Sequence, residues 1–313
     1  ARVLVVARLS SENVDWLQEE LPDVPTAVYT VDDPTAPLHP PENKGREAMV
    51  YLSYLIDHYD NLPDEMIFLH YHRWAWHNND VLQSDIVETI TRLSSSYVQR
   101  EGYVNLRCHS GLRCTHFINT SDPETWPFSL TNQNIDLIAV FQELFPGHRV
   151  PETVAHTCCA QFALSKSLAL NATRQRYIDL RDWILNNSFN NWTSGYIFEL
   201  LWHYVFTNKS VVCPRADICY CEAFGICFGS DSQLTVWSEL RDKQRKLQSV
   251  LNLLEAEENE EQKDRGPTGN ITSELREKIQ KVGDQLEARL TAAKRRGEDP
   301  GNRATDSWKA SKG

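Results

Sequence analysis

The sequence has no run of about 18 apolar residues, so no helix of it is expected to span a membrane. Basic side chains are the minority, 32 against 43 acidic ones, and the net charge of −11 excludes the electrostatic surface that nucleic-acid binding requires. Gly-x-Gly-x-x-Gly, a phosphate-binding loop and Gly-x-Ser-x-Gly are all missing. The first two absences argue against a classical dinucleotide site and a nucleoside triphosphatase, and without the third motif no arrangement for a Ser, Cys or Thr nucleophile can be distinguished.

The charges that are present are distributed unevenly. The whole net charge falls on residues 1–230, whereas residues 231–313 carry 16 acidic and 16 basic side chains and no cysteine. The tail has two apolar stripes at helical spacing: Leu240, Leu247, Val250, Leu251 and Leu254, then Leu275, Ile279, Val282, Leu286 and Leu290. We therefore expect an α/β domain at 1–230 and a helical hairpin with a disordered end at 231–313, the hairpin being a candidate surface for self-association or a partner.

Cysteines and glycosylation sequons indicate the compartment. Six Asn-x-Ser/Thr sequons occur, at Asn119, Asn171, Asn186, Asn191, Asn208 and Asn270, and the eight cysteines are an even number. Cys108 and Cys114 could close a small loop, and four more cysteines cluster between residues 213 and 227, but the sequence leaves the pairing open. Disulfides are favoured over zinc, so we expect a protein of the secretory pathway, either secreted or in the Golgi lumen with a membrane anchor upstream of this sequence.

Apolar runs of the first part alternate between strand and helix patterns. Residues 2–7 and 27–31 predict strands, with an amphipathic helix between them that Pro22 ends. Residues 45–60 predict a strong amphipathic helix and residues 66–69 a further strand. This order predicts an α/β fold with a mixed, mainly parallel sheet flanked by helices, in which ligands collect at the carboxyl ends of the strands.

The segment from His70 to Asp80 follows the last of these strands and is the densest group of chemistry-bearing residues. His70 and His72 would project to one face, and His77 with Asp80 could return from the loop, so a divalent metal such as Mn²⁺ or Zn²⁺ is one interpretation. The alternative is that these side chains fill the loop and bind backbone groups. Arg73 and Trp76 are further candidates for ligand contact.

Three other positions carry candidate functions. Asp32 and Asp33 end a strand, where carboxylates often receive ribose hydroxyls, although Asp-Asp-Pro is also an ordinary turn. Lys44 and Arg46 precede a helix and could hold a phosphate, or only cap it. Glu199, Trp202 and His203 share one helical side, where Glu199 could be a general base or part of a structural ion pair.

These blocks, taken in order, resemble the domain of unknown function 3431 family, which is common in fungi. The resemblance covers roughly residues 3–228 and leaves the tail outside. It rests on Val-Val-Ala-Arg (5–8) with Trp16-Leu17, Asn-Lys-Gly-Arg-Glu-Ala (43–48) with Tyr51-Leu52, Asn61-Leu62-Pro63, Phe68-Leu69-His70, His72-Arg73, Trp76-His77-Asn78, Gly102 to Cys108, Cys158 to Ala163, Glu199 with Trp202-His203, and Cys213-Pro214.

The resemblance implies a distant relation to nucleotide-sugar glycosyltransferases of the GT-A fold, with the first strand opening the nucleotide-binding half. Where such a transferase shows Asp-x-Asp, this chain has His70-Tyr71-His72, so a metal site of the usual kind would need His77, Asp80 or Asp85 as a substitute.

The leading hypothesis is therefore a glycosyltransferase-like protein of the secretory pathway, with a nucleotide-sugar donor and a glycan or small hydroxylated acceptor. Arg8, Asp32, Asp33, Lys44, Arg46, Arg73, Trp76 and Trp202 would bind nucleotide or substrate, Glu199, His77 and Asp80 would act in catalysis, and His70, His72 and His77 would hold a metal. Two alternatives are a histidine-metal hydrolase or oxidase centred on His70, His72 and His77, and a non-catalytic carbohydrate-binding or scaffold protein.

Overall fold

In the computed structural model, the described residues are 1–313 except 109–113, 115, 133–134, 262–268 and 304–313. The chain divides into two compact units, Ala1–Pro214 and Arg215–Gly313. This boundary precedes the predicted one near residue 230, because helix α10 (Ala216–Phe224) groups with the long helix that follows it. The expected disorder of the last dozen residues lies outside the described residues.

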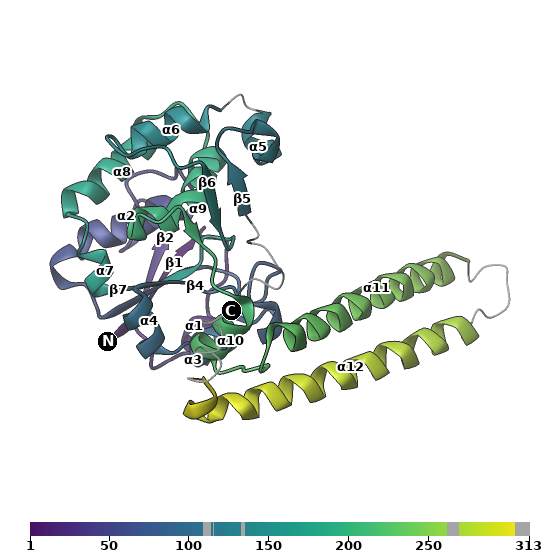
Figure 1. The fold of residues 1–313 in the computed structure, drawn as a ribbon. Helices are drawn as coiled ribbons and strands as arrows, with labels where there is room; N and C mark the ends of the chain where they lie inside the picture. Colours follow the sequence, from purple (N-terminus) through teal and green to yellow (C-terminus); the bar gives the residue numbers. More distant parts are fainter. Residues whose placement is uncertain (109–113, 115, 133–134, 262–268, 304–313) are drawn as a thin grey trace. The chain divides into compact units, whose positions relative to one another are not determined.

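The first unit is built on a five-stranded sheet with the strand order β2-β1-β3-β7-β4 (Figure 1). Its strands are β1 (Arg2–Arg8), β2 (Thr26–Thr30), β3 (Glu65–His70), β4 (Tyr103–Asn105) and β7 (Phe162–Ser165). Strand β1 pairs in parallel with β2 and β3, whereas β7 runs antiparallel to both β3 and β4.

A smaller sheet of the same unit has the order β5-β6-β8, within the part of the chain that the structure describes. Strand β5 (His116–Asn119) is antiparallel to β6 (Thr153–His156), and β6 is parallel to β8 (Val211–Val212). The predicted α/β fold with a helix-flanked mixed sheet is confirmed. The expectation of a mainly parallel sheet was wrong, because apolar runs locate strands but leave the direction of β7 and of the second sheet undetermined.

Strands β1, β3 and β7 are buried on both faces, as their continuous apolar runs predict. Alternate residues belong to different sides of the sheet: Val5, Phe68 and Phe162 join the main core cluster, while their neighbours Leu4 and Leu69 are buried outside it. Figure 1 shows α2, α8 and α9 on one side of this sheet and α1, α3 and α4 on the other. Two helical layers therefore cover the sheet.

The helices of the first layer are α2 (Glu47–Asp57), α8 (Arg174–Asn186) and α9 (Asn191–Thr207), with α6 (Leu137–Leu144) beside α8. The second layer holds α1 (Trp16–Glu20), α3 (Ile86–Arg92) and α4 (Ser95–Glu101). Short elements are α5 (Phe128–Thr131), α7 (Lys166–Ala169) and three 3₁₀ turns at Tyr59–Asn61, Asp80–Leu82 and Pro123–Thr125.

Helix α2 is the centre of the first layer. Every residue from Glu47 to Ile56 is buried, because α2 contacts β1 on one side and α8 and α9 on the others. A helix that is buried all round must be apolar all round, and α2 is nearly so. Glu47 and Tyr51 are therefore buried polar groups close to the strand ends, a position that the amphipathic pattern did not reveal.

The second unit contains α10 and the two helices that the tail stripes predict, α11 (Asp231–Glu261) and α12 (Gly269–Glu298). They pack side by side, with Leu251, Val282, Leu286 and Leu290 buried, so the helical hairpin is confirmed. No helix of the described residues is long and apolar enough to cross a membrane.

All eight cysteines are disulfide-bonded. Cys114 pairs with Cys213, so the prediction of a small loop closed by Cys108 and Cys114 was wrong. Cys114 precedes β5 and Cys213 follows β8, and both of these strands pair with β6, which brings the two distant cysteines together. Cys221 pairs with Cys227, and Cys158 pairs with its neighbour Cys159. The disulfides are consistent with a secreted or secretory-pathway protein.

Candidate functional site

The site lies where three parallel strands end. Register places Arg8 of β1 beside Thr30 of β2, and Ala7 of β1 beside His70 of β3. The loops that follow these strands therefore leave from one edge of the sheet, which is where ligands of α/β sheets collect.

A fourth segment reaches the same edge because β7 is antiparallel. Phe162 pairs with Phe68 near the end of β3, so the residues just before β7, Cys158 to Gln161, lie beside the carboxyl end of β3. The Gln161 side chain accepts from the His70 N–H (3.1 Å) and donates to Asn78 (2.9 Å), which fixes the start of the loop after β3. Sequence reasoning could not place this segment without knowing the direction of β7.

These segments and two helices enclose a cavity of about 330 Å³. Its lining comes from the β1, β2 and β3 ends, the start of α2, the Cys159 loop and α9: Ala7, Arg8, Leu9, Glu12, Val31, Asn43, Arg46, Glu47, His70, Tyr71, His72, Trp76, His77, Cys159, Asn191 and Glu199. The predicted residues Arg8, Arg46, His70, His72, Trp76, His77 and Glu199 are therefore brought together. Sequence reasoning missed Glu12, Glu47, Cys159 and Asn191, among others, as part of the site.

Asp32 and Asp33 do not line the cavity, although Val31 does. Both carboxylates are occupied locally: Asp32 accepts from the Ser10 N–H and hydroxyl (2.7 and 2.8 Å), and Asp33 accepts from the Thr35 N–H and hydroxyl (2.9 and 2.7 Å). These hydrogen bonds lower the pKa of each carboxyl. The structure favours the turn interpretation for this pair, and the nucleoside contact stays a prediction.

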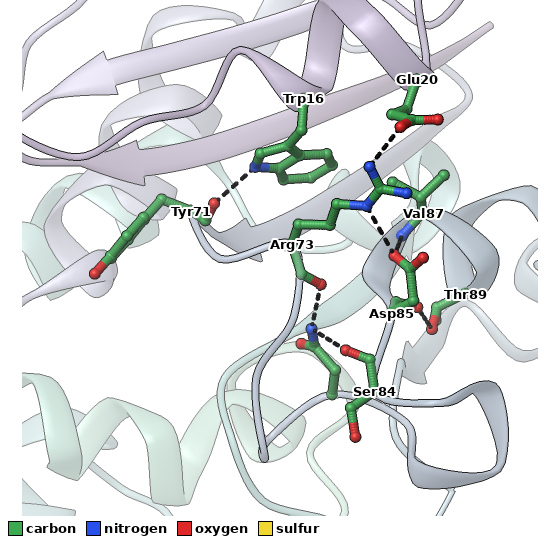
Figure 2. Close-up of polar contacts among 9 residues, drawn as sticks. Trp16, Glu20, Tyr71, Arg73, Ser84, Asp85, Val87 and Thr89 are labelled. Carbon is green, nitrogen blue, oxygen red and sulfur yellow. Dashed lines mark hydrogen bonds and ion pairs between the residues drawn. The ribbon is translucent and has the colours of Figure 1, made fainter.

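Lys44 and Arg73 also lie outside the lining, each bound to protein groups. Lys44 donates to the carbonyls of Leu185 and Asn187, at 3.2 and 2.6 Å, which joins the start of α2 to the end of α8. Figure 2 shows the Arg73 guanidinium between Glu20 and Asp85, with which it forms ion pairs at 2.5 and 3.6 Å. Lys44 and Arg73 therefore stabilise the elements around the cavity through these contacts.

Trp202 and Asp80 complete the group outside the cavity. Trp202 is only 1% exposed and packs among Tyr51, Phe162 and Phe206, because α9 turns the Glu199 side toward the cavity and Trp202 into the core. Asp80 opens a 3₁₀ turn that does not line the cavity. For Trp202 the burial leaves no surface on which a ligand could stack.

The three histidines lie close together in the lining. The His70 ring is 4.7 Å from that of His77, which is 5.6 Å from that of His72. His70 Nε2 is 2.8 Å from the Cys159 carbonyl, and since a carbonyl only accepts, this nitrogen carries the proton. Burial, then the charges of His70 and His72, lowers the pKa of His77 to about 3, so its imidazole is neutral at pH 7.

The metal interpretation was tested on this arrangement. No group of three or more His, Cys, Asp or Glu among the described residues is placed to hold a metal ion. His70 Nε2 is committed to a backbone carbonyl, which leaves His72 Nδ1 and His77 Nε2 as buried ring nitrogens without a hydrogen-bond partner. The described side chains therefore do not fit a resident divalent metal.

Glu47, which is buried, and Glu199, which is partly buried, place two carboxyls on the wall formed by α2 and α9. Burial, then the charge of Glu47, raises the pKa of Glu199 to about 7, while Arg46 and the Cys159 N–H, at 3.2 Å, lower it. Glu47 lies 3.8 Å from Arg46 Nε. A carboxyl whose pKa lies near 7 can take up or release a proton at neutral pH, which is the property that a general base needs.

The turn before α2 holds Arg46 in place. Gly45 and Arg46 have φ values of 78° and 52°, and the Arg46 N–H donates to the Asn191 side chain at 2.8 Å. A positive φ is uncommon for arginine and is retained only where neighbours enforce it. Gly195 of α9 lets this turn approach, because a Cβ there would lie 2.8 Å from the Gly45 carbonyl oxygen and 2.9 Å from Arg46 Cβ.

Replacing Gly195 with alanine is therefore expected to lower the free energy of unfolding by about 1–3 kcal/mol, since the added methyl meets backbone that cannot move aside. Gly283→Ala in α12 is the control, because a Cβ there meets only the end of the Gln244 side chain and improves helix propensity. Urea unfolding compares the two. Equal stability of Gly195→Ala and the native protein would contradict the close packing of α9 on this turn.

The outer rim of the cavity is aromatic. Trp76 is 78% exposed although it lines the cavity, and the Arg107 guanidinium lies 6.0 Å from its ring. An exposed indole in the same lining as partly or fully buried carboxyls suits ligands that have both apolar faces and hydroxyl groups.

Fold and site together define a mixed α/β protein with a ligand-sized cavity at its strand ends, whose lining includes two carboxyls of α2 and α9, two guanidiniums and an exposed indole. The chain belongs to the family described as Protein of unknown function (DUF3431), whose model matches residues 4–222. No curated protein and no solved structure matches it. The family span covers every cavity residue and ends before α11.

Proposed function

We propose that this protein binds a nucleotide-sugar in the strand-end cavity and transfers the sugar to a hydroxyl of a glycan or small acceptor, with Glu199 as the base. The observation that carries the proposal is the partly buried Glu199 carboxyl, whose pKa of about 7 arises in a cavity that Arg8, Arg46 and Trp76 also line. The proposal includes a distant relation of this family to nucleotide-sugar glycosyltransferases of the GT-A fold.

The cavity offers one group for each part of such a ligand. Arg8, fixed by hydrogen bonds to Thr30 (3.4 Å) and to the Glu12 carbonyl (3.2 Å), and Arg46 present guanidiniums that suit a diphosphate. Trp76 presents an apolar ring face, which suits a sugar ring. Asn43 and Asn191 add amides that could bind hydroxyls.

In the proposed reaction, the Glu199 carboxylate takes the proton of the acceptor hydroxyl as the oxygen attacks the anomeric carbon. The bond between that carbon and the diphosphate oxygen breaks, and the nucleoside diphosphate leaves with the electron pair. Arg8 and Arg46 offset the charge that grows on the leaving group. Because the pKa of Glu199 lies at about 7, its carboxylate form is available at neutral pH to take this proton.

The balance of charge in the cavity predicts how binding responds to pH. Two guanidiniums face three carboxyls, those of Glu12, Glu47 and Glu199. An anionic donor therefore favours the protonated form of Glu199, and donor affinity should fall as pH rises through about 7.

Thermal-shift screening with UDP-sugars and GDP-sugars, with and without Mn²⁺, tests the proposal. We expect at least one donor to raise Tm, more at pH 6 than at pH 8, and Arg46→Gln to abolish the shift. Arg100→Gln, an exposed arginine that pairs with the neighbouring Glu101, is the control and should keep it. No shift with any nucleotide, together with binding on a glycan array, would replace the proposal with a non-catalytic carbohydrate-binding function.

A further inference from the structure

We propose that the disulfide between the adjacent residues Cys158 and Cys159 positions both polar walls of the cavity through one residue, Cys159. Its N–H donates to the Glu199 carboxylate at 3.2 Å, and its carbonyl accepts from His70 Nε2 at 2.8 Å. Glu199 belongs to α9 and His70 to β3, so Cys159 connects, through one hydrogen bond on each side, two walls that come from distant parts of the chain. Only the catalytic role of Glu199 rests on the proposed function.

The backbone at this point is held in an unusual conformation. Cys159 and Ala160 have φ values of 93° and 46°, which residues with a Cβ rarely adopt. Such conformations persist where the surroundings over-determine them, and they concentrate at functional sites. A bond between neighbouring sulfurs closes a small ring around the Cys158–Cys159 peptide and restricts its torsions.

Contacts from β4 hold the ring from the other side. Asn105 donates to the carbonyls of Thr157 and Cys158, at 2.9 and 3.2 Å, and accepts from the Arg107 N–H at 2.9 Å. The Arg107 guanidinium lies 3.3 Å from the Cys158 sulfur and 3.7 Å from the Cys159 sulfur. Both cysteines are about 95% buried, with exposures of 4% and 5%. The ring is thus packed as a fixed part of the wall.

A positioning role makes a specific prediction for Glu199. Four groups face its carboxylate: Glu47, Arg46 and Tyr51 of the α2 region, and the Cys159 N–H. The Cys159 N–H stabilises the ionised form, so a Cys159 peptide released from its ring should let the pKa of Glu199 rise. If the Cys158–Cys159 disulfide only stabilised the fold, a folded variant without it would keep the pKa of Glu199 unchanged.

The titration of Glu199 can be followed by infrared spectroscopy through the band of its protonated carboxyl group. The Glu199 band is identified as the one that is missing in Glu199→Gln. In the double variant Cys158→Ser with Cys159→Ser we expect the midpoint to rise by about one pH unit. The double variant Cys158→Ser with Cys159→Gly keeps access to the positive φ without the ring, and the same rise is expected there. The control, Cys221→Ser with Cys227→Ser, removes a disulfide elsewhere and should leave the midpoint unchanged.

An unchanged midpoint in either folded variant of Cys158 and Cys159 would overturn the inference. The titration needs no ligand, so it can fail while nucleotide-sugar binding stands, and it can succeed if no nucleotide binds. The two proposals are therefore separately testable.

Discussion

Glu199→Gln is expected to be more stable than the native protein at pH 8, by up to about 3 kcal/mol, and equally stable near pH 4.5. Burial raises the pKa of Glu199 from 4.5 to about 7. Its contribution to stability is therefore fully present below pH 4.5 and is lost as pH rises through about 7, where the partly buried carboxyl becomes charged. Glutamine stays neutral and keeps the oxygen that accepts from the Cys159 N–H.

His77 changes the free energy of unfolding with pH in the opposite direction to Glu199. The effect of Glu199 must therefore be measured as the difference in stability between the native protein and Glu199→Gln. Its pKa is lowered to about 3, and the stability that its neutral form provides is present above pH 6.5 and lost as pH falls toward 3. Both proteins share this loss, and it cancels in the difference. Urea unfolding at half-unit steps from pH 4.5 to 8 gives the difference curve; parallel pH profiles for the two proteins would contradict the buried, proton-binding Glu199.

Trp202→Ala is expected to cost about 3–5 kcal/mol of unfolding free energy, because it empties the aromatic core between α9, α2 and the sheet. Trp202 contacts the rings of Tyr51, Phe162 and Phe198 at 5.9, 5.5 and 5.2 Å. Trp192→Ala on the same helix is the control: Trp192 is 41% exposed and stacks only on Tyr196 among the described ring contacts, so the cost should be about 1 kcal/mol.

Two measurements on Trp202→Ala separate a core role of Trp202 from a role in ligand binding. Chemical denaturation gives the stability of the variant, and donor binding is measured on its folded fraction. A normal stability of Trp202→Ala with lost binding would restore the predicted ligand contact and contradict the core position. A large loss of stability with donor binding intact at low temperature supports the structure.

The strand ends of the site could be predicted from sequence because β1, β2 and β3 are continuous or nearly continuous apolar runs. Parallel strands place their carboxyl ends on one edge, and this argument correctly brought Arg8, His70 and His72 together. The same argument did not reveal that the carboxylates of Asp32 and Asp33 bind Ser10 and Thr35 in local turns, and their nucleoside contact stays a prediction. Hydrogen bonding within a turn is not visible in a strand pattern.

Helical periodicity found Glu199 but could not say which way its face points. Glu199, Trp202 and His203 share a helical side by spacing, yet Glu199 lines the cavity while Trp202 and His203 are buried in the interior. Glu47 was missed as a site residue because a carboxylate in the first turn of a helix is ordinarily a cap. The only signal was Gly45 before Arg46, where a glycine permits the turn that directs both side chains inward.

The part of the cavity lining that Cys159 supplies could not be predicted, because it depends on the direction of β7. Cys159 lies beside the end of β3 only because β7 runs antiparallel to β3, and the sequence left about 105 sets of disulfide pairings open, so the bond to Cys158 could not be singled out. Register and direction are properties of the assembled sheet rather than of one short strand.

Release of free nucleoside diphosphate from UDP-sugars and GDP-sugars, in the presence of mixed glycan acceptors, tests the central claim most directly. The proposed function predicts release by the native protein, a fall of about 10²–10⁴-fold in Glu199→Gln, and no change in Glu101→Gln, a surface carboxyl paired with Arg100. Release that is equal in the native protein and in Glu199→Gln, or no release and no binding with any donor, would contradict it.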